Sequence, residues 1–551
     1  MTGWRLFLSA LLILLIGLPV LLPLVECFQL GHLSYLETDA DYLMQLARNT
    51  LFLIGGTLAL ALPVGTFLAV LLFRTDLPWR RFWIVGTLMV LFVPLPMLMA
   101  AWTALFGIDG WWPIAGWRLN QSQAWTIGLY PAVWVHGLAG IPWVVLIVGN
   151  GLCWIERELE EDALLHVGPW SVLWQVTLPR CRGSLAAAAL WLSLATFAEI
   201  GITNYLQLPT LAEEVQTQFS SGTREALARS VLLSLPIVLA ISGLLLWLTP
   251  RLENLLPPLQ GWLAPPRPFP LGSARWPLAW LLAGFAAVLV LTPLASLMWQ
   301  VGLAGSPRAW SLHQAWARLG SDSRVVLPLV LQTFATAGAA AFITSGLGLM
   351  TCWLARDSRW FRGLVLVLMV FVWSLPGPVI GIGLKETVNA IMDVLEKMHV
   401  PIEPVKMLLY DGPSPLPVMW AQTVRFLPVA TALLWPWVRT VPRELLESAR
   451  LEGARPLQEM TAVIWPLVAR GFGWTFLIIA ALCLSEVAAS NRVETPGWKT
   501  FANVLFDRMH YRFASPIAAM CLILLGCLLA LFGLGMLCRA CLRRILRPGA
   551  W

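Results

Sequence analysis

Two acidic residues stand inside otherwise apolar stretches of this sequence, and each is followed five residues later by an asparagine. The stretches read Glu199-Ile-Gly-Ile-Thr-Asn204 and Glu486-Val-Ala-Ala-Ser-Asn491. An ionisable residue inside a membrane span costs about 2.5–3.5 kcal/mol on insertion scales, so it marks a cavity or a partner by default. We name these four residues as candidates for a translocation pathway, where paired carboxylates suit a cation. The alternative is a structural carboxylate that pairs with a backbone amide or an arginine.

A second pair of motifs lies just upstream, at about residues 156–180 and 443–467. The later copy contains Glu447, Ala449, Gly453 and Pro466, with alanine two residues after the glutamate, glycine six after it, and proline thirteen after the glycine. An acidic residue near the start of a short helix, a glycine turn and a second short helix ended by proline predict a rigid hairpin on the membrane surface. Its polar face would be free to bind a partner.

The earlier copy is a degraded version of the same pattern, with Glu160, Ala163, Gly168 and Pro179 as its candidate residues. His166 stands where the later copy has Gly453, so we expect Gly168 to supply the turn and the second helix to be two residues shorter. An ordinary amphipathic loop explains one such segment. Two segments at corresponding positions favour a shared function.

Both segments resemble the EAA coupling loop of ABC importer permeases, with Glu447, Ala449, Gly453 and Pro466 at the family's positions. The resemblance implies that each hairpin docks on a separate ABC ATPase subunit and transmits its closure to the spans; two hairpins imply two ATPase copies. After each acidic residue, a proline and a threonine-led short helix before the last span resemble the fused ferric-iron and thiamine permeases. That branch implies a type I fold and a periplasmic or extracellular substrate-binding protein at the outer surface.

The elements that position these motifs are membrane spans. The sequence is 58% hydrophobic and only 12% charged, against roughly a quarter charged in soluble domains. Apolar runs of about 20 residues, enough to cross a bilayer, predict an all-α polytopic membrane protein with about twelve transmembrane helices. We place the spans at 6–25, 51–73, 83–107, 130–152, 185–206, 229–249, 277–299, 327–354, 363–384, 415–437, 471–490 and 515–538. The first is interpreted as a retained span and not as a signal peptide.

Arginines set the expected orientation, because short cytoplasmic loops carry the excess of positive charge. They follow the even-numbered spans, as in Arg80 and Arg81, Arg180 and Arg182. We therefore expect a multi-pass protein of the bacterial inner membrane, surrounded by lipid, with both termini cytoplasmic. The net charge of +7 is then a topology signal, and no nucleic-acid partner is expected.

A proline-rich stretch at 255–275 is expected to be a cytoplasmic linker between two permease halves, 1–254 and 276–551. A shift of 287 residues, drifting to 282 or 283 upstream, superposes matching residues and predicts two tandem six-helix repeats. Such parallel halves would pack about an axis along the membrane normal, with a pathway between them. Pro94, Pro96, Pro376 and Pro378 should kink spans three and nine. The matched pairs include Thr50 with Thr333, Pro94 with Pro376, Pro179 with Pro466, Glu199 with Glu486, and Asn204 with Asn491.

Enzymatic functions find little support in the sequence. No phosphate-binding Gly-x-x-x-x-Gly-Lys-Ser/Thr motif is present, so ATP hydrolysis would require another polypeptide. The six histidines lack ligand spacing, and the tryptophans suit membrane interfaces. We therefore expect no catalytic residue, no metal site and no cofactor. A membrane enzyme would need a catalytic arrangement that the longest outer loop, from 385 to 414, lacks.

The main alternative is a twelve-span secondary transporter of the major facilitator type, which also has two parallel six-span halves. That family lacks paired coupling loops. Permeases of the resembling branch carry ferric iron, thiamine, sulfate-like oxyanions or polyamines. Glu199 and Glu486 favour a cation, so ferric iron or another small cation such as thiamine is the expected substrate.

Overall fold

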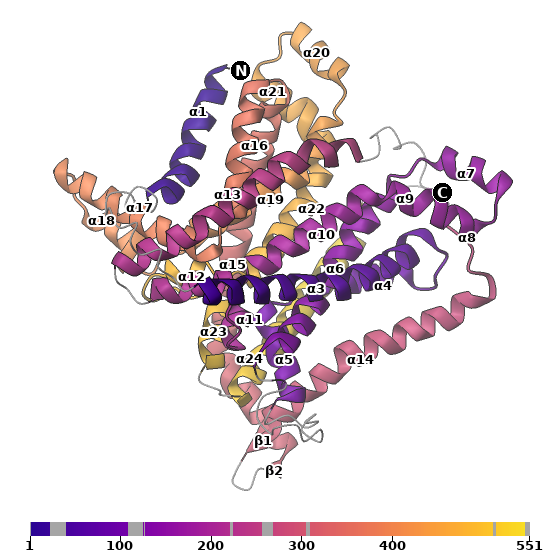
Figure 1. Cartoon of the computed structure of the whole chain (residues 1–551), viewed down its shortest axis with the longest axis horizontal. Coiled ribbons are helices and arrows are strands. Elements are labelled where there is room, and N and C mark those ends of the chain that lie inside the picture. The colour runs from indigo at the N-terminus through magenta and orange to yellow at the C-terminus, as the bar shows by residue number, and fades with distance from the viewer. Residues whose placement is uncertain are drawn as a thin grey trace.

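The computed structural model describes residues 2–22, 40–107, 125, 127–220, 224–255, 268–304, 309–510 and 514–545. Within these ranges the named elements are helices, apart from a short antiparallel hairpin of β1 (Leu303–Ala304) and β2 (Ala309–Trp310) in which Leu303 pairs with Trp310. The chain is an all-α polytopic membrane protein (Figure 1).

The N-terminal segment, residues 1–254, contains most of α13 and all the helices before it. In chain order these are α1 (Thr2–Leu12), the π-helical η1 (Ile13–Gly17), α3 (Ala40–Arg74), α4 (Arg80–Val90), α5 (Leu95–Phe106), α6 (Leu129–Cys153), α7 (Arg157–His166), α8 (Pro169–Val172), the π-helical η4 (Leu173–Thr177), α9 (Leu178–Arg180), α10 (Arg182–Phe197), α11 (Gly201–Tyr205), α12 (Leu211–Ser220) and α13 (Arg224–Leu255).

The C-terminal segment, residues 276–551, follows a single 3₁₀ turn, η6 (Gly272–Ala274). Its helices are α14 (Arg275–Gly302), α15 (Leu312–Arg356), α16 (Arg359–Ser374), α17 (Gly377–Lys397), α18 (Glu403–Lys406), the π-helical η7 (Met407–Asp411), α19 (Leu416–Arg439), α20 (Arg443–Leu451), α21 (Pro456–Glu459), the π-helical η8 (Met460–Ile464), α22 (Trp465–Ser485), η9 (Ser490–Arg492), α23 (Phe501–His510) and α24 (Ala514–Ile545).

Seven helices among the described residues are long and apolar enough to cross a membrane, and up to nine if each of two bent pairs counts as one span. Helices occur at all twelve predicted positions, but three do not reach that length and hydropathy. Helix α10 has only 16 residues, the apolar part of α13 is Ser234–Thr249, and α19 carries Gln422 and Arg425. Twelve spans therefore stay a prediction.

The predicted proline kinks are confirmed, and they are breaks rather than gentle bends. Helices α4 and α5 meet at 98°, and α16 and α17 meet at 110°. Pro94 and Pro376 cap the second helix of each pair with nearly identical backbone angles, φ −59° and ψ 141° against φ −58° and ψ 142°. Pro96 and Pro378 follow in the first turn, where proline's missing N–H is not needed.

The two segments interlock through their first helices. Leu12 and Ile16, from α1 and η1, share a hydrophobic core with Phe361 of α16, while Leu282 of α14 shares a core with Val148 of α6. Inside the segments, α3 packs along α6, and α15 packs along α19 and α22 (Figure 1). Each segment therefore packs against the first helix of the other.

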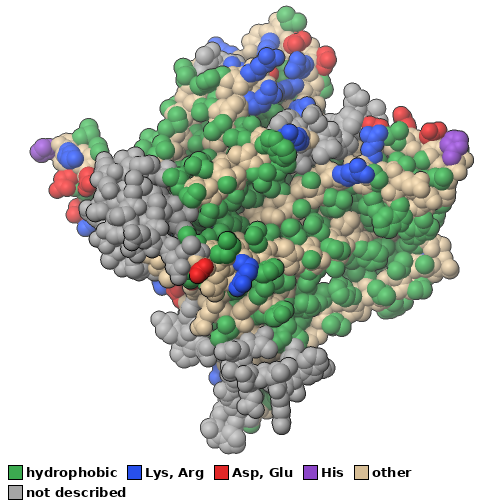
Figure 2. Space-filling model, viewed as in Figure 1, with side chains coloured by type: hydrophobic (Ala, Val, Ile, Leu, Met, Phe, Trp, Pro, Cys, Tyr) green, Lys and Arg blue, Asp and Glu red, His purple; other side chains and the backbone are tan. Residues whose placement is uncertain are grey.

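Polar contacts gather several helix ends at one end of the molecule, which we call the hairpin end. Arg5 of α1 donates to the carbonyl of Leu354 in α15, and Arg356 at the end of α15 donates to the carbonyl of Val441, just before α20. Figure 2 shows Lys and Arg side chains clustered over α20 and α21 at the top of the view, with a broad hydrophobic face below.

The end of the predicted linker is anchored at this same end of the molecule. Phe269 N–H donates to the Arg74 carbonyl at 2.7 Å, and Leu271 N–H donates to the Asp76 carboxylate at 2.8 Å. Helix α14 then begins at Arg275, close to the predicted start of the second half. Residues 256–267, which carry most of the linker, lie outside the described residues.

Candidate functional site

Glu199 and Glu486 line one cavity of about 210 Å³ between the N-terminal and C-terminal segments. Each lies just beyond the end of a helix, Glu199 after α10 and Glu486 after α22. The cavity walls come from α4, α5, α6 and α10 on one side and from α16, α17, α19 and α22 on the other. Val93 and Leu375, which flank the two proline breaks, also line it. Equivalent elements of the two segments therefore enclose the same space.

Glu486 is held almost entirely by protein groups. Its carboxylate accepts the N–H groups of Ala489 at 2.7 Å and Ser490 at 2.9 Å and lies 3.2 Å from Nη1 of Arg425. Only 1% of its side chain is exposed. The structural alternative for the acidic residues thus describes Glu486 well, because its carboxylate caps η9 and neutralises the partly buried Arg425.

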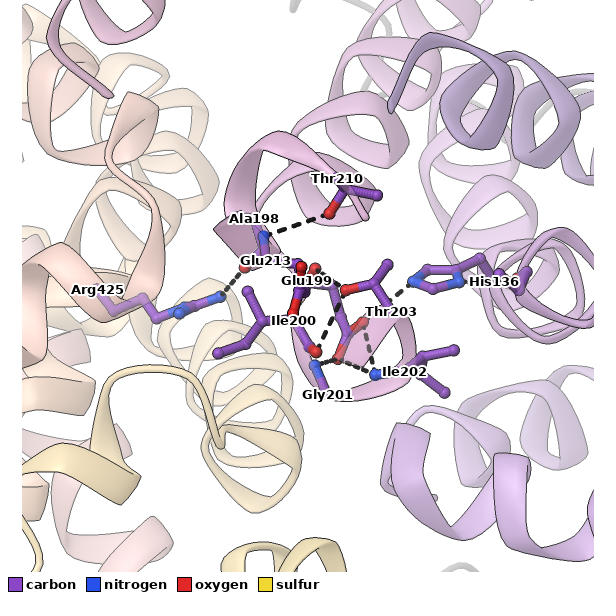
Figure 3. Close-up of polar contacts among 11 residues, drawn as sticks. His136, Ala198, Glu199, Ile200, Gly201, Ile202, Thr203, Thr210, Glu213 and Arg425 are labelled. Carbon is purple, nitrogen blue, oxygen red and sulfur yellow. Dashed lines mark hydrogen bonds and ion pairs between the residues drawn. The ribbon is translucent and has the colours of Figure 1, made fainter. Parts of the chain in front are cut away.

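Glu199 has a similar cap and a more open position (Figure 3). Its Oε1 accepts from Gly201 N at 2.6 Å and its Oε2 from Ile202 N at 3.1 Å, which starts α11. The side chain is 20% exposed, and Oε2 lies 3.4 Å from Nε2 of His136 in α6. Glu199 therefore presents a carboxylate oxygen to the cavity.

The asparagines named with these carboxylates are not part of the cavity wall. Asn204 donates its side-chain N–H to Glu213 at 3.2 Å, and Asn491 is partly buried within η9. The helices also end earlier than predicted. Span 185–206 breaks after Phe197 and resumes at Gly201, and span 471–490 ends at Ser485, because each glutamate bonds the backbone of the next turn.

His136 and Arg425 are cavity residues that sequence reasoning missed. Arg425 binds Glu486 and also donates from Nη2 to the Ala198 carbonyl at 3.4 Å, which links the two segments (Figure 3). The sequence did contain an indication for Arg425, since an arginine inside a predicted span is unusual. No such indication pointed to His136, because a lone histidine shows no ligand spacing.

Three tryptophans also line the cavity. Trp191 of α10 has its ring centroid 4.8 Å from that of Trp143 in α6 and 6.1 Å from that of Trp373 in α16. These indoles are packed between helices, so the membrane-interface interpretation does not apply to them.

The second hairpin, α20–α21, turns at Gly453. This residue has φ +82°, and Ala454 N–H closes the turn on the Ala449 carbonyl at 2.9 Å. Arg450 pairs with Glu459 at 2.8 Å and with Asp357 at 2.9 Å. The hydrogen bonds that Arg450 donates to these carboxylates raise its pKa. The glycine turn predicted from the motif is therefore present, with a left-handed backbone, in a hairpin tied to the end of α15.

The first hairpin, α7–α8, differs from the prediction. Helix α7 continues through His166, and the turn is made by extended residues, Val167 at φ −139° and Gly168 at φ −68°. Helix α8 starts at Pro169, as α21 starts at Pro456; 456 minus 169 is again 287. The expected shortening of the second helix is therefore wrong. Without a glycine at 166 the first helix runs on, and Gly168 has backbone angles open to any residue.

Proline does not end the second helix of either hairpin. Pro179 lies in α9 and Pro466 in α22, each in the first turn after a π-helical segment, η4 or η8. The wider π turn directly before each proline keeps the path helical. In the second hairpin this path runs unbroken from Pro456 to Ser485, next to Glu486; in the first it is interrupted at Cys181.

Glu160 and Glu447, paired in the sequence comparison, have different environments. Glu160 is buried and forms an ion pair with Arg74 of α3, and Thr177 donates to its other oxygen at 2.7 Å. Glu447 is exposed on α20. Ala163 is half-buried in α7, and Ala449 is half-buried in α20. Large apolar side chains are exposed nearby, including Leu165 at 80% and Leu451 at 89%.

Far from the hairpins, the predicted short helices are present as α12 and α23. Thr50 of α3 accepts the Leu211 N–H at 3.1 Å, and Thr333 of α15 accepts the Phe501 N–H at 2.8 Å. The threonines matched in sequence thus hold the first residues of matching helices.

Comparison with known proteins adds two distant relatives. The chain is 26% identical over 244 residues to "Fe(3+)-transport system permease protein FbpB 2" of Haemophilus influenzae, covering 42% of this chain and 44% of that protein. It is 29% identical over 256 residues to "Sulfate permease 2, chloroplastic" of Chlamydomonas reinhardtii, covering 43% of this chain and 66% of that protein. Both findings support a membrane transport permease. The chain spans less than two thirds of either relative's length, and no protein-family model matches it.

Proposed function

We propose that this chain is the transmembrane permease subunit of an ATP-driven importer, with two tandem six-helix halves that form the solute pathway. The observation that carries the proposal is the path from each hairpin to the cavity. Helices α8 to α10 lead from the first hairpin to Glu199, and α21 to α22 lead from the second to Glu486. A force applied to either hairpin would reach the cavity wall along consecutive helices, which form one unbroken path only in the second hairpin.

The two hairpins are the proposed coupling loops. They expose large apolar residues, Leu165 and Leu451, beside charged ones, as expected where a partner docks. Coupling residues are Glu160, Ala163, Gly168 and Pro179 in the first loop, and Glu447, Ala449, Gly453 and Pro466 in the second. The partners are a separate ABC ATPase, in two copies, and a substrate-binding protein at the end that holds α12 and α23.

The proposed setting is the bacterial inner membrane, with the hairpin end in the cytoplasm. Arginines at this end, such as Arg356 and Arg443, agree with the positive-inside rule. The contact of Arg5 with the end of α15 puts the start of α1 on the same side. Both termini are proposed to be cytoplasmic.

The proposed substrate is ferric iron or another small cation such as thiamine. One relative is named for Fe(3+) transport, and Glu199 presents a carboxylate to the cavity. The sulfate permease relative and the cavity position of Arg425 support an oxyanion as the second candidate. Arg425 is already neutralised by Glu486, so we favour the cation.

Affinity purification of the full chain from its native membrane tests the function. We expect a stoichiometric ATPase subunit to co-purify and to be lost when Glu447 and Gly453 are both replaced. A matched control replaces Glu403 and Gly128, which lie outside both hairpins; a side chain at Gly128 would meet nothing within 4 Å, and Gly128 has a positive φ as Gly453 has. A chain that purifies alone and moves solute along an ion gradient would identify a secondary transporter of the major facilitator type instead.

A further inference from the structure

His136 is oriented so that its Nε2 faces the Glu199 carboxylate at the wall of the cavity. Its Nδ1 lies 2.8 Å from the Ala132 carbonyl oxygen. Because a carbonyl oxygen only accepts, Nδ1 must carry the hydrogen, and the neutral ring then has its lone pair on Nε2. His136 is buried, with 4% of its side chain exposed, and Nε2 has no hydrogen-bond partner among the described residues.

Glu199 has a carboxylate oxygen that faces Nε2 of His136. Its Oε1 accepts two backbone N–H groups, from Gly201 and Ile202, and its Oε2 accepts one, from Ile202. A carboxylate has about four acceptor sites, so Oε2 keeps one free. Oε2 lies 3.4 Å from His136 Nε2, and no hydrogen bond of acceptable geometry joins them. The two atoms thus face each other at the wall of the cavity that both residues line.

We infer that His136 Nε2 and Glu199 Oε2 form a two-ligand subsite for a first-row transition-metal ion in transit. Imidazole nitrogen and carboxylate oxygen are a ligand pair that such ions prefer. Metal–ligand bonds of about 2.0–2.2 Å drawn from atoms 3.4 Å apart meet at about 110°, close to the tetrahedral angle. By comparison, two adjacent ligand atoms of an octahedral metal ion with bonds of the same length would lie about 3 Å apart.

The surroundings of this subsite suit the passage of a metal ion rather than its storage. Two protein ligands leave the remaining coordination to water, and conduction requires binding weak enough for release. The nearby cation Arg425 is neutralised by Glu486, so it opposes a metal less than a free arginine would. The two carboxylates then have different roles. Glu199 binds the metal ion, and Glu486 positions Arg425. This inference rests on the proposed function and names the substrate class of its cavity.

Co²⁺ is the probe, because tetrahedral Co²⁺ absorbs visible light far more strongly than octahedral Co²⁺. The full chain in detergent carries Asn at His32, His166, His313, His399 and His510, so that His136 is its one histidine. We expect intense visible absorption on titration with Co²⁺. The two test variants are Glu199→Gln, which keeps an oxygen for the Gly201 N–H, and His136→Asn, which keeps a donor for the Ala132 carbonyl. Each should weaken binding at least tenfold.

Glu494→Gln, between η9 and α23, is the matched control and should bind Co²⁺ like the parent. Co-purification of the ATPase in every variant reports that the fold and the proposed function are intact. Unchanged affinity in both test variants, or no binding in a chain that retains its ATPase, would overturn the subsite alone. Sulfate binding that needs Arg425, without Co²⁺ binding, would also overturn it. Loss of the ATPase from the parent chain would count against the proposed function.

Discussion

Glu199 and Glu486 occupy corresponding sequence positions and both cap a helical turn, yet their exposures are 20% and 1%. The difference comes from their partners. Arg425 covers Glu486, whereas His136 leaves an oxygen of Glu199 open to the cavity. An equivalence read from the sequence therefore locates two carboxylates correctly and does not distinguish a binding group from a structural one.

The buried carboxyl group of Glu494 gives a prediction on pH. Burial raises its pKa above the ordinary 4.5, although N–H groups of Thr500 and Asn503 favour the ionised form. A raised folded-state pKa means that this group's contribution to stability is complete below the unfolded-state pKa and is lost as pH rises through the folded-state pKa.

Glu494→Gln removes that dependence. We expect the variant's melting temperature, relative to the parent, to rise as pH increases from about 4 towards neutrality. Glu403→Gln, at an exposed position, is the control and should show no such trend. A difference that is constant with pH would contradict the assignment.

At the scale of elements, the hairpins and the broken helices were predicted with different success. The proline pairs predicted both helix breaks because proline acts locally on its own backbone. The first hairpin was predicted wrongly, since the absence of a glycine at 166 lengthened α7 instead of shortening α8. The π-helical segments before Pro179 and Pro466 have no local sequence signature, and neither does the contact that orients His136.

Gly453 and Gly168 form a matched pair for testing the hairpins. A side chain at either would meet nothing within 4 Å, but only Gly453 has a left-handed backbone. Gly453→Val should strain the second hairpin by about 1–2 kcal/mol, which would lower ATPase-subunit affinity about 5- to 30-fold. Gly168→Val should change it little. The measurement is the affinity of the purified ATPase for each variant. Equal effects of the two substitutions would refute the role of the Gly453 turn.

Glu160 and Glu447 should differ in stability. Glu160→Ala leaves Arg74 buried without its carboxylate and should reduce the free energy of unfolding by about 3–5 kcal/mol. Glu447→Ala, at an exposed site, should stay within about 0.5 kcal/mol while weakening the ATPase contact. Denaturant unfolding in detergent measures both. Recovery in a double variant, Arg74→Met with Glu160→Leu, would show that the loss came from the unpaired charge.

On the scale of the whole molecule, composition alone sufficed to predict an all-α membrane protein, and the arrangement of its segments needed the structure. Interlocking of α1 with α16 and of α14 with α6 depends on shape complementarity between apolar faces, which sequence periodicity does not encode. The cavity arises the same way, from helices that are far apart in the chain.

Ser242 of α13 and Ser374 of α16 test a further contact between the two segments, because their hydroxyl oxygens are 3.0 Å apart. With a protease site inserted within 256–267, the Ser242→Cys and Ser374→Cys double variant should run as one band after oxidation and cleavage. Each single variant should run as two bands, which controls for native cysteines. Separate bands from the double variant would disprove the contact.

The ion pair between Arg74 and Glu160 also bears on biosynthesis. The two residues are 86 positions apart, so a ribosome must extend the chain through α6 before the arginine meets its carboxylate. In the second hairpin Arg450 finds Glu459 only nine residues later, and Asp357 is already made. A nascent chain stalled between Cys153 and Glu160 would therefore keep Arg74 without its carboxylate partner.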